Sequence, residues 1–343
     1  VLVDPISWTV GRVIIGFCFC GVYITAESWL NDASTNETRG KALSIYMIVQ
    51  MAGIVFAQWI GSQGDVSGYV LFIIPSVLVS LAFAPVLLSA RPMPAFETTK
   101  PMKIRALIVA SPLSCFSMFM LGGIFAEQFG MTAVYGTRVG LTVGEISFFV
   151  SAIYVAALVL QYPIGWLSDR MDRRRLIIWI AFLGGAGSLI AFLLPGYYTI
   201  IVLSGAIVGG MSNPLYALII AYTNDYLDKD DMAAASGGLL FINGLGAIAG
   251  PRIVGFTMDA IGNNGYWRFT ATLMFAVGFY GLYRTTRRSR SDMDAETVPY
   301  TPLSAASTPV VAEVAQEAYI EAEAEIAETT DADERPAVSP TVS

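Results

Sequence analysis

The sequence predicts an all-α integral membrane protein, and its composition is the first observation that predicts it. Hydrophobic residues make up 55% of the 343 residues, and charged residues make up only 14%. Soluble domains carry about 25% charged residues, so a chain this poor in charge cannot cover a surface that faces water. Most of the surface must therefore face lipid, which excludes a soluble enzyme.

Nine apolar runs are long enough to cross a bilayer, which takes roughly 17–25 helical residues. Because a segment in lipid must satisfy its own backbone hydrogen bonds, each run is expected to be a helix. Turn-forming residues separate the runs, as at Asn31, Gly196 and Asn263. The predicted spans are residues 8–30, 42–62, 69–89, 107–131, 145–166, 176–194, 198–222, 235–258 and 267–283.

Lys and Arg fall on alternate loops between these spans. Fifteen lie in one set of loops and in the stretch after the last span, whereas the opposite loops hold only Arg138 and Arg268. The positive-inside rule places the larger set in the cytoplasm. We therefore expect a multi-pass protein of the cytoplasmic (inner) membrane with its C-terminus in the cytoplasm.

The end of the chain differs from the rest in composition. Residues 284–343 begin as a basic juxtamembrane stretch and continue as an acidic tail. Residues 291–343 carry a net charge of −11, against +4 for residues 1–290, and contain few large apolar side chains. Such a segment cannot bury a core, so a disordered, solvated tail is expected, with a binding role as the alternative.

The loop between the spans at 145–166 and 176–194 carries a sequence signature. It reads Gly165-Trp-Leu-Ser-Asp169-Arg170-Met-Asp-Arg173-Arg174. This resembles the loop signature of the major facilitator superfamily, G-x-x-x-D-R-x-G-R-R, with Asp172 where glycine is usual. The acidic residue could face a positive helix N-terminus, and the arginines could hold carboxylates of adjacent helices. Such a cluster would lock a cytoplasmic gate; the alternative is a positive-inside loop alone.

An internal repeat predicts a larger architecture. Gly16 matches Gly209, and Asn31 matches Asn224, both at an offset of 193 residues. Parallel halves related in this way are typical of transporters. Because each half of a superfamily member holds six spans, the resemblance implies a major facilitator fold of two six-helix bundles. In this interpretation nine spans are present and the first three helices are missing; a true nine-span protein is the alternative.

The resemblance covers residues 5–283 and implies a domain organisation. Residues 1–90 would be the remainder of the N-terminal bundle, 91–105 a cytoplasmic linker and 106–283 the C-terminal six-helix bundle. The segments Ala26-Glu27-Ser28-Trp29-Leu30 and Arg39-Gly40-Lys41 resemble the uncharacterised YcaD-like branch. Membership of that branch implies transport without supplying a substrate. In this interpretation the span at 42–62 is the fifth of the superfamily fold. It lacks the Gly-Pro signature that antiporters carry in that span, which weakens an argument for proton antiport.

The predicted cytoplasmic gate combines the signature with two acidic residues at helix ends. Asp225 is expected to meet Arg170 or Arg173, and Glu27 is expected to meet the same signature on the missing loop. The full set is Gly165, Asp169, Arg170, Arg173, Arg174, Asp225 and Glu27.

Charged groups inside a membrane cost a few kcal/mol or more near its centre, so each requires a reason. Arg12 could bind an anionic substrate or interact with a carboxylate; alternatively it reaches outward to water. Glu127 is the most plausible proton carrier, because the chain has no histidine and desolvation favours a protonated carboxyl group; alternatively it already faces water. Arg252 and Asp259, seven residues apart, are expected to form a structural pair.

Polar residues at membrane depth are candidates for substrate contact. The resemblance implies that the first, fourth, seventh and tenth helices line the cavity, which favours Asn213, Tyr216 and Tyr23. Each could instead bond only a neighbouring helix. The sequence thus predicts a secondary transporter of a small molecule, acting by alternating access with coupling to protons. The alternative is a sensor or scaffold that retains the fold; no cofactor, metal or nucleic acid is expected, and the protein is expected to be a monomer embedded in the lipid bilayer.

Overall fold

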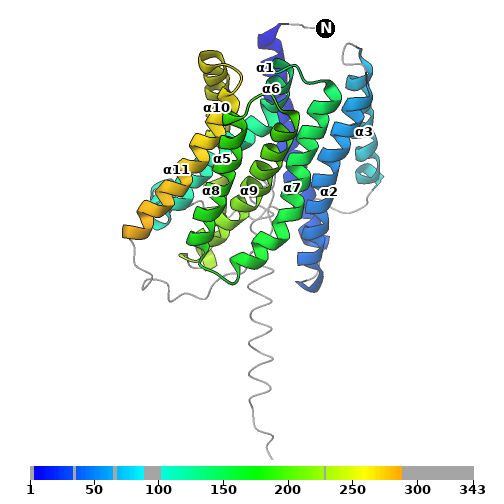
Figure 1. Ribbon diagram of the computed structural model, residues 1–343. Helices are drawn as coiled ribbons and strands as arrows, with labels where there is room; N and C mark the ends of the chain where they lie inside the picture. The colour runs from blue at the N-terminus through cyan, green and yellow to red at the C-terminus, as the bar shows by residue number, and fades with distance from the viewer. Residues whose placement is uncertain (1–3, 34–35, 65–67, 89–101, 228, 288–343) are drawn as a thin grey trace, which may run out of the picture.

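The computed structural model describes residues 4–33, 36–64, 68–88, 102–227 and 229–287, and over these residues the chain is a succession of helices. Figure 1 shows them as a bundle of long rods. The first three are α1 (Pro5–Ala33), α2 (Asn36–Gln63) and α3 (Val70–Leu88). The remaining helices are α4 (Ile104–Ala110), α5 (Pro112–Gly130), α6 (Thr132–Arg138), α7 (Val143–Ser168), α8 (Arg173–Leu193), α9 (Tyr198–Asn224), α10 (Lys229–Ile261) and α11 (Gly265–Arg287).

All nine predicted spans coincide with helices of the described chain, although not all of these helices qualify as spans. Seven are long and apolar enough to cross a membrane. Helix α3 is apolar over the shorter segment Val70–Pro85, and α11 is not among the seven. The all-helical membrane fold is therefore confirmed, while the count of nine spans stays a prediction.

The span predicted at 107–131 is divided in the structure. Helix α4 ends at Ala110, and α5 begins at Pro112 after Ser111, whose backbone is non-helical with φ −136° and ψ 77°. Proline lacks a backbone N–H and disfavours helical geometry in the residue before it. The prediction of one unbroken helix was wrong here, because the apolar run hides this break.

Helices α5 to α11 pack into one bundle. Helix α5 lies along α10, α7 along α9, and α8 along both α9 and α11. At the α5–α10 crossing, Asn243 donates a hydrogen bond from Nδ2 to the carbonyl oxygen of Met118 at 3.1 Å. A Cβ at Gly246 would overlap the carbonyl oxygen of Phe119, so the two backbones touch where glycine permits it.

This contact predicts the effect of a substitution. Gly246→Val is expected to lower the free energy of unfolding by about 3 kcal/mol, because the added methyl groups would meet backbone atoms that cannot move aside. Gly244→Val is the matched control, since a Cβ at Gly244 would meet nothing within 4 Å. Unfolding in mixed detergent micelles measures both variants. Equal losses of stability would show that the α5–α10 contact is not the cause.

The first three helices are far less covered than the bundle. In the most apolar stretch of α1 none of the residues is buried, and in that of α2 11% are, against 67% in α5 and α9. Helix α2 does pack on α7, where Met51 joins Val150 and Tyr154 in a small buried cluster. Helices α1 and α3 thus present wide open faces in the described structure.

Candidate functional site

The signature loop joins α7 to α8 through a turn that its own residues stabilise. Asp169 is the C-cap of α7, and Asp172 is the N-cap of α8. Asp172 accepts a hydrogen bond from the backbone N–H of Arg175 at 3.1 Å. Aspartate satisfies an otherwise unpaired helix N–H in this way, which explains physically why it can replace the usual glycine.

Arg173 forms the ion pair that the sequence predicted with Asp225. Both residues are buried, with 3% and 7% of their surfaces exposed. The guanidinium donates from Nη1 to the Asp225 carboxylate, and also to the carbonyl oxygen of Ala221 at 3.3 Å. Its Nη2 lies 3.6 Å from Oδ1 of Asp169. The predicted pair is confirmed for Arg173.

The other two arginines of the signature point elsewhere. The Arg170 guanidinium lies over the Trp166 ring at 4.2 Å and donates to the Trp166 carbonyl oxygen at 3.1 Å. Arg174 donates to the hydroxyl oxygens of Tyr222 and Tyr226 at 3.2 and 3.1 Å. Of the three arginines, Arg173 is therefore the one seen bound to Asp225.

The geometry of the Arg173–Asp225 pair limits what it can do. It connects the start of α8 to the end of α9, and both helices belong to the same bundle. A bond within one bundle cannot by itself close a passage between two bundles. The pair can hold the adjoining ends of α8 and α9 together. Its role in a gate stays a prediction.

Glu27 lies near the C-terminal end of α1 and is buried, with 1% exposed. It accepts a hydrogen bond from the Tyr46 hydroxyl at 2.9 Å, and Tyr46 in turn accepts one from Gln50 at 3.2 Å. The carboxyl group is also close enough to Tyr216 of α9 to interact with it electrostatically. This end of α1 therefore meets the bundle, whereas the predicted contact with a missing loop remains a prediction.

Arg12 and Tyr23 occupy the open part of the same helix. Arg12 is exposed and lines a groove of about 250 Å³ with Trp8, Gly11 and Ile15. Tyr23 is half-buried, and its ring lies 6.3 Å from that of Phe19. Cys20 of the same helix is exposed and is not among the described residues that line this groove.

Glu127 lies in the interior of the bundle, on α5. It is fully buried, with 0% exposed, which overturns the alternative that it already faces water. Its Oε2 accepts a hydrogen bond from the hydroxyl of Thr270 on α11. Its Oε1 is buried without a hydrogen-bond partner among the described residues. The next residue, Gln128, donates to Ser212 of α9 at 3.1 Å, so this turn of α5 joins two neighbouring helices.

The polar candidates of α9 are covered in this structure. Asn213 is 4% exposed and donates to the carbonyl oxygen of Gly209 in its own helix at 3.1 Å. Tyr216 is 3% exposed, and its ring meets that of Phe125 edge-on at 6.0 Å. Substrate contact by either residue stays a prediction.

The expected pair of Arg252 with Asp259 was wrong. Asp259 instead accepts a hydrogen bond from Arg138 at 2.8 Å, and Asn263 donates to the Arg138 carbonyl oxygen at 3.0 Å. Seven residues of an α-helix rise about 10 Å, so Arg252 and Asp259 lie far apart along α10. The short helix α6, which was not predicted, brings Arg138 to the end of α10.

Thr270 is the residue that sequence reasoning missed, since an isolated threonine in an apolar run gives no sign of its partner. No group of three or more His, Cys, Asp or Glu that could hold a metal ion occurs in the part of the chain that the structure describes.

The fold and these buried polar contacts define a polytopic helical membrane protein. The family described as Major Facilitator Superfamily matches residues 107–315, and the family described as Sugar (and other) transporter matches residues 5–95. Since the first match covers more than half of the chain, the protein belongs to the major facilitator superfamily.

Relatives carry names that agree with this assignment. A protein of Escherichia fergusonii named uncharacterized MFS-type transporter YcaD is 23% identical over 276 residues, which cover 78% of this chain and 70% of the relative. Its namesake in Salmonella heidelberg is 23% identical over 283 residues, covering 80% and 72%. An uncharacterized MFS-type transporter of Yersinia pestis is 24% identical over 270 residues, covering 76% and 68%.

Proposed function

We propose that this protein is a secondary active transporter that moves a small molecule across the cytoplasmic membrane by alternating access. Membership of the superfamily and the names of the relatives support transport of some solute. The observation that carries the proposal further is the buried Glu127 carboxyl group, one oxygen of which has no partner among the described residues. A sensor or scaffold has no need of such a group, because burying it costs free energy.

The open faces of α1 to α3 support a second part of the proposal, that three further helices complete an N-terminal bundle. A Cβ added at Gly11, Gly16 or Gly21 of α1 would meet nothing within 4 Å. The glycines of the α5–α10 crossing, in contrast, are in contact with backbone. Glycines of this kind in membrane helices commonly permit close packing, so those of α1 suggest a partner helix.

Helix α10 supports the same architecture from the other bundle. Its residues Phe241, Leu245, Ile248 and Phe256 recur at helical spacing and are all exposed. Helix α7 of the same bundle already has a partner from the preceding segment, because α2 packs against it. A two-bundle protein with parallel halves would cover the α10 stripe with a helix of the preceding segment.

The gate would lie at the end where α1 meets the bundle. Glu27 accepts the hydrogen bond from Tyr46 there, and it also interacts electrostatically with Tyr216 of the bundle. The Arg173–Asp225 pair would hold α8 and α9 rigid behind this contact. Opening toward the cytoplasm would separate Glu27 from Tyr216 and leave the Arg173–Asp225 pair intact.

Coupling to protons would use Glu127. Removing a carboxylate from water without a cation beside it costs several kcal/mol, so a buried carboxyl group favours its neutral form. Alternating access would expose the group to water in another conformation, where it could release the proton.

Flux in proteoliposomes tests the proposal. With a pH-sensitive dye inside, sugars, organic anions and amines are added outside one at a time, with and without a pH gradient. A chain extended at its N-terminus by three helices is expected to show solute-dependent proton flux, and the 343-residue chain is expected to show none. Equal flux from both chains would show that the 343-residue chain, with its nine predicted spans, is the working protein. Absence of flux from both for every solute would favour the sensor or scaffold.

A further inference from the structure

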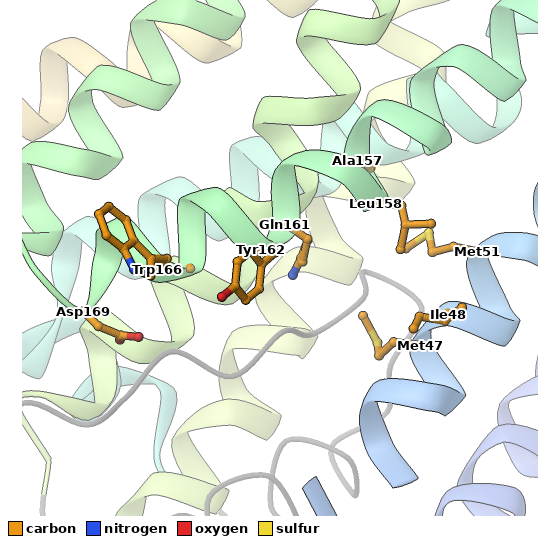
Figure 2. A pocket seen from close by; sticks show the side chains of 10 residues that line it. Met47, Ile48, Met51, Ala157, Leu158, Gln161, Tyr162, Trp166 and Asp169 are labelled. Atoms are coloured by element: carbon orange, nitrogen blue, oxygen red, sulfur yellow. The ribbon is translucent and has the colours of Figure 1, made fainter. Parts of the chain in front are cut away.

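Two pockets lie near the signature loop, and they differ in chemistry. The larger, of about 530 Å³, lies between α2 and α7, and Asp169 is the one charged residue among its described lining residues (Figure 2). Arg173 lies 3.6 Å from that carboxylate, so the polar end of this pocket is already engaged. The smaller lies where α5 begins and combines cations with hydroxyl groups. Its lining is Ser111, Pro112, Leu113, Arg174, Tyr222 and Arg284.

Three helices bring the basic residues of the smaller pocket to the start of α5. Arg174 is in the first turn of α8, and Arg284 is in the last turn of α11. A Cβ added at Gly281, almost one turn before Arg284, would lie 2.7 Å from Ile178 of α8 and 3.9 Å from Leu113 of α5. The missing side chain at Gly281 thus lets the end of α11 approach both helices.

The start of α5 supplies backbone donors. Pro112 is the first residue of this 19-residue helix, and the side chain of Ser111 before it caps none of the helix N–H groups. The Ser111 hydroxyl is paired instead with that of Ser114 at 2.6 Å. N–H groups in the first turn of a helix have no partner within the helix, and the helix dipole makes this end partly positive. An acceptor in the pocket could therefore bind here.

Tyr222 adds a side-chain donor. Its hydroxyl oxygen accepts hydrogen bonds from Nε of Arg174 at 3.2 Å and from the Tyr226 hydroxyl at 3.3 Å. Both acceptor positions of this oxygen are then used, while its own hydrogen has no acceptor among the described residues. Tyr222 is 5% exposed, so water at the surface does not replace that acceptor. A group in the pocket that Tyr222 lines could accept this hydrogen.

Arg284 brings a second cation to the pocket. It is half-buried and makes no hydrogen bond or ion pair in the part of the chain that the structure describes. Arg174 contributes positive charge while its guanidinium stays bonded to the two tyrosines. No carboxylate is among the described residues that line the pocket. Donors from several helices therefore converge with no negative charge between them, which is the arrangement that an anion requires.

The volume of the pocket limits the ligand. It is about 10 Å³, close to the space that one water-sized atom needs, so one oxygen of a larger anion fits inside. Phosphate oxygens point in several directions, and both helix N-termini and arginine suit them. We propose that this pocket binds a phosphate group, with one oxygen at the start of α5 and Tyr222 and another at Arg284. Binding requires no transport, so this proposal and the proposed function can fail separately.

Two lipids that differ only in the phosphate group test the proposal. The 343-residue chain in maltoside micelles, which contain no phosphate, is titrated with phosphatidic acid and with the diacylglycerol of the same acyl chains. Native mass spectrometry measures both affinities. Phosphatidic acid is expected to bind at least about tenfold more tightly, because diacylglycerol cannot form the charge-assisted hydrogen bonds. This preference would show that the phosphate, and not the acyl chains, is the bound group.

Inorganic phosphate is the second probe, because the group could also arrive from solution. At constant ionic strength, phosphate in place of chloride should raise the melting temperature and displace phosphatidic acid if free phosphate enters the pocket. Phosphatidic acid that resists displacement would identify a lipid headgroup as the source. Chloride that displaces phosphatidic acid as well as phosphate does would overturn the proposal. So would phosphatidic acid that binds no better than diacylglycerol, together with phosphate that acts no differently from chloride.

Matched variants locate the bound phosphate. Arg284→Gln is expected to weaken binding of the phosphate probe about tenfold. Arg175→Gln removes an equal charge from an exposed position outside the described lining and should change binding by less than about twofold. Tyr222→Phe removes the unused donor and should weaken binding more than Tyr226→Phe, which removes the other hydroxyl bonded to Arg174. A loss in Arg284→Gln no larger than that in Arg175→Gln would mean that phosphate binds the basic surface in general, and the proposal would be wrong.

Discussion

Glu127→Gln is expected to abolish transport driven by a pH gradient, with a loss of about 100-fold or more in the coupled rate. The substitution keeps the size and shape of the side chain but cannot take up or release a proton. A positioned proton-transfer group typically contributes 10²–10⁴-fold, which sets the expected scale. Thr270 would still have an oxygen to donate to, so the α5–α11 contact is retained. The measurement is solute-dependent change of internal pH in proteoliposomes that hold the chain extended at its N-terminus, with and without the substitution.

Two further variants separate proton binding from packing. Glu127→Asp keeps a carboxyl group and is expected to retain part of the coupled transport, although the shorter side chain moves it away from Thr270. Thr270→Val removes the hydroxyl donor while preserving shape, and it should alter the pH dependence without abolishing coupling. Infrared spectroscopy gives a readout that needs no solute, because the C=O band of a protonated carboxyl group should disappear in Glu127→Gln. Unchanged coupled flux in Glu127→Gln would exclude this residue as the carrier.

Much of the fold followed from the sequence because lipid leaves few alternatives. A long apolar run in a membrane must be a helix, so all nine predicted runs appear as helical segments. The break at Ser111 was missed because Pro112 sits inside an apolar run, and hydropathy does not register the loss of one backbone donor. The short helix α6 was also missed. It begins at Thr132, just after α5 ends at Gly130, and its seven residues are too few to form a span of their own.

Contacts in the candidate site could be predicted only between residues that the order of the spans places at the same end of the bundle. Arg173 and Asp225 follow spans that end on the same side, so their meeting could be expected and is observed. The partner of Glu127 could not be expected, because 143 residues separate it from Thr270 and nothing in the local pattern links them. Arg252 and Asp259 show the opposite error: proximity in sequence suggested a pair, but the helix rise separates them and Arg138 is closer to Asp259.

Arg173→Ala is expected to lower the free energy of unfolding by about 3–5 kcal/mol, because it leaves the Asp225 carboxylate buried without its cation. Asp225→Asn should cost less, since the neutral amide oxygen can still accept from the guanidinium. Replacing both residues with leucine is expected to cost less than the sum of the two single leucine substitutions, as the buried charges are removed together.

Arg170→Ala is the matched control for this pair. Its guanidinium is exposed and lies over Trp166, and an exposed cation–π contact contributes only about 0.5–1 kcal/mol. Unfolding in mixed micelles measures stability for all variants, and flux through the N-terminally extended chain, at a temperature where each variant is folded, measures function. If the pair only anchors α8 to α9, the double leucine variant recovers both stability and flux. If the gate needs the charges themselves, stability returns in that variant while flux does not. A loss in Arg173→Ala no larger than that in Arg170→Ala would show that the buried pair does not hold the ends of α8 and α9 together.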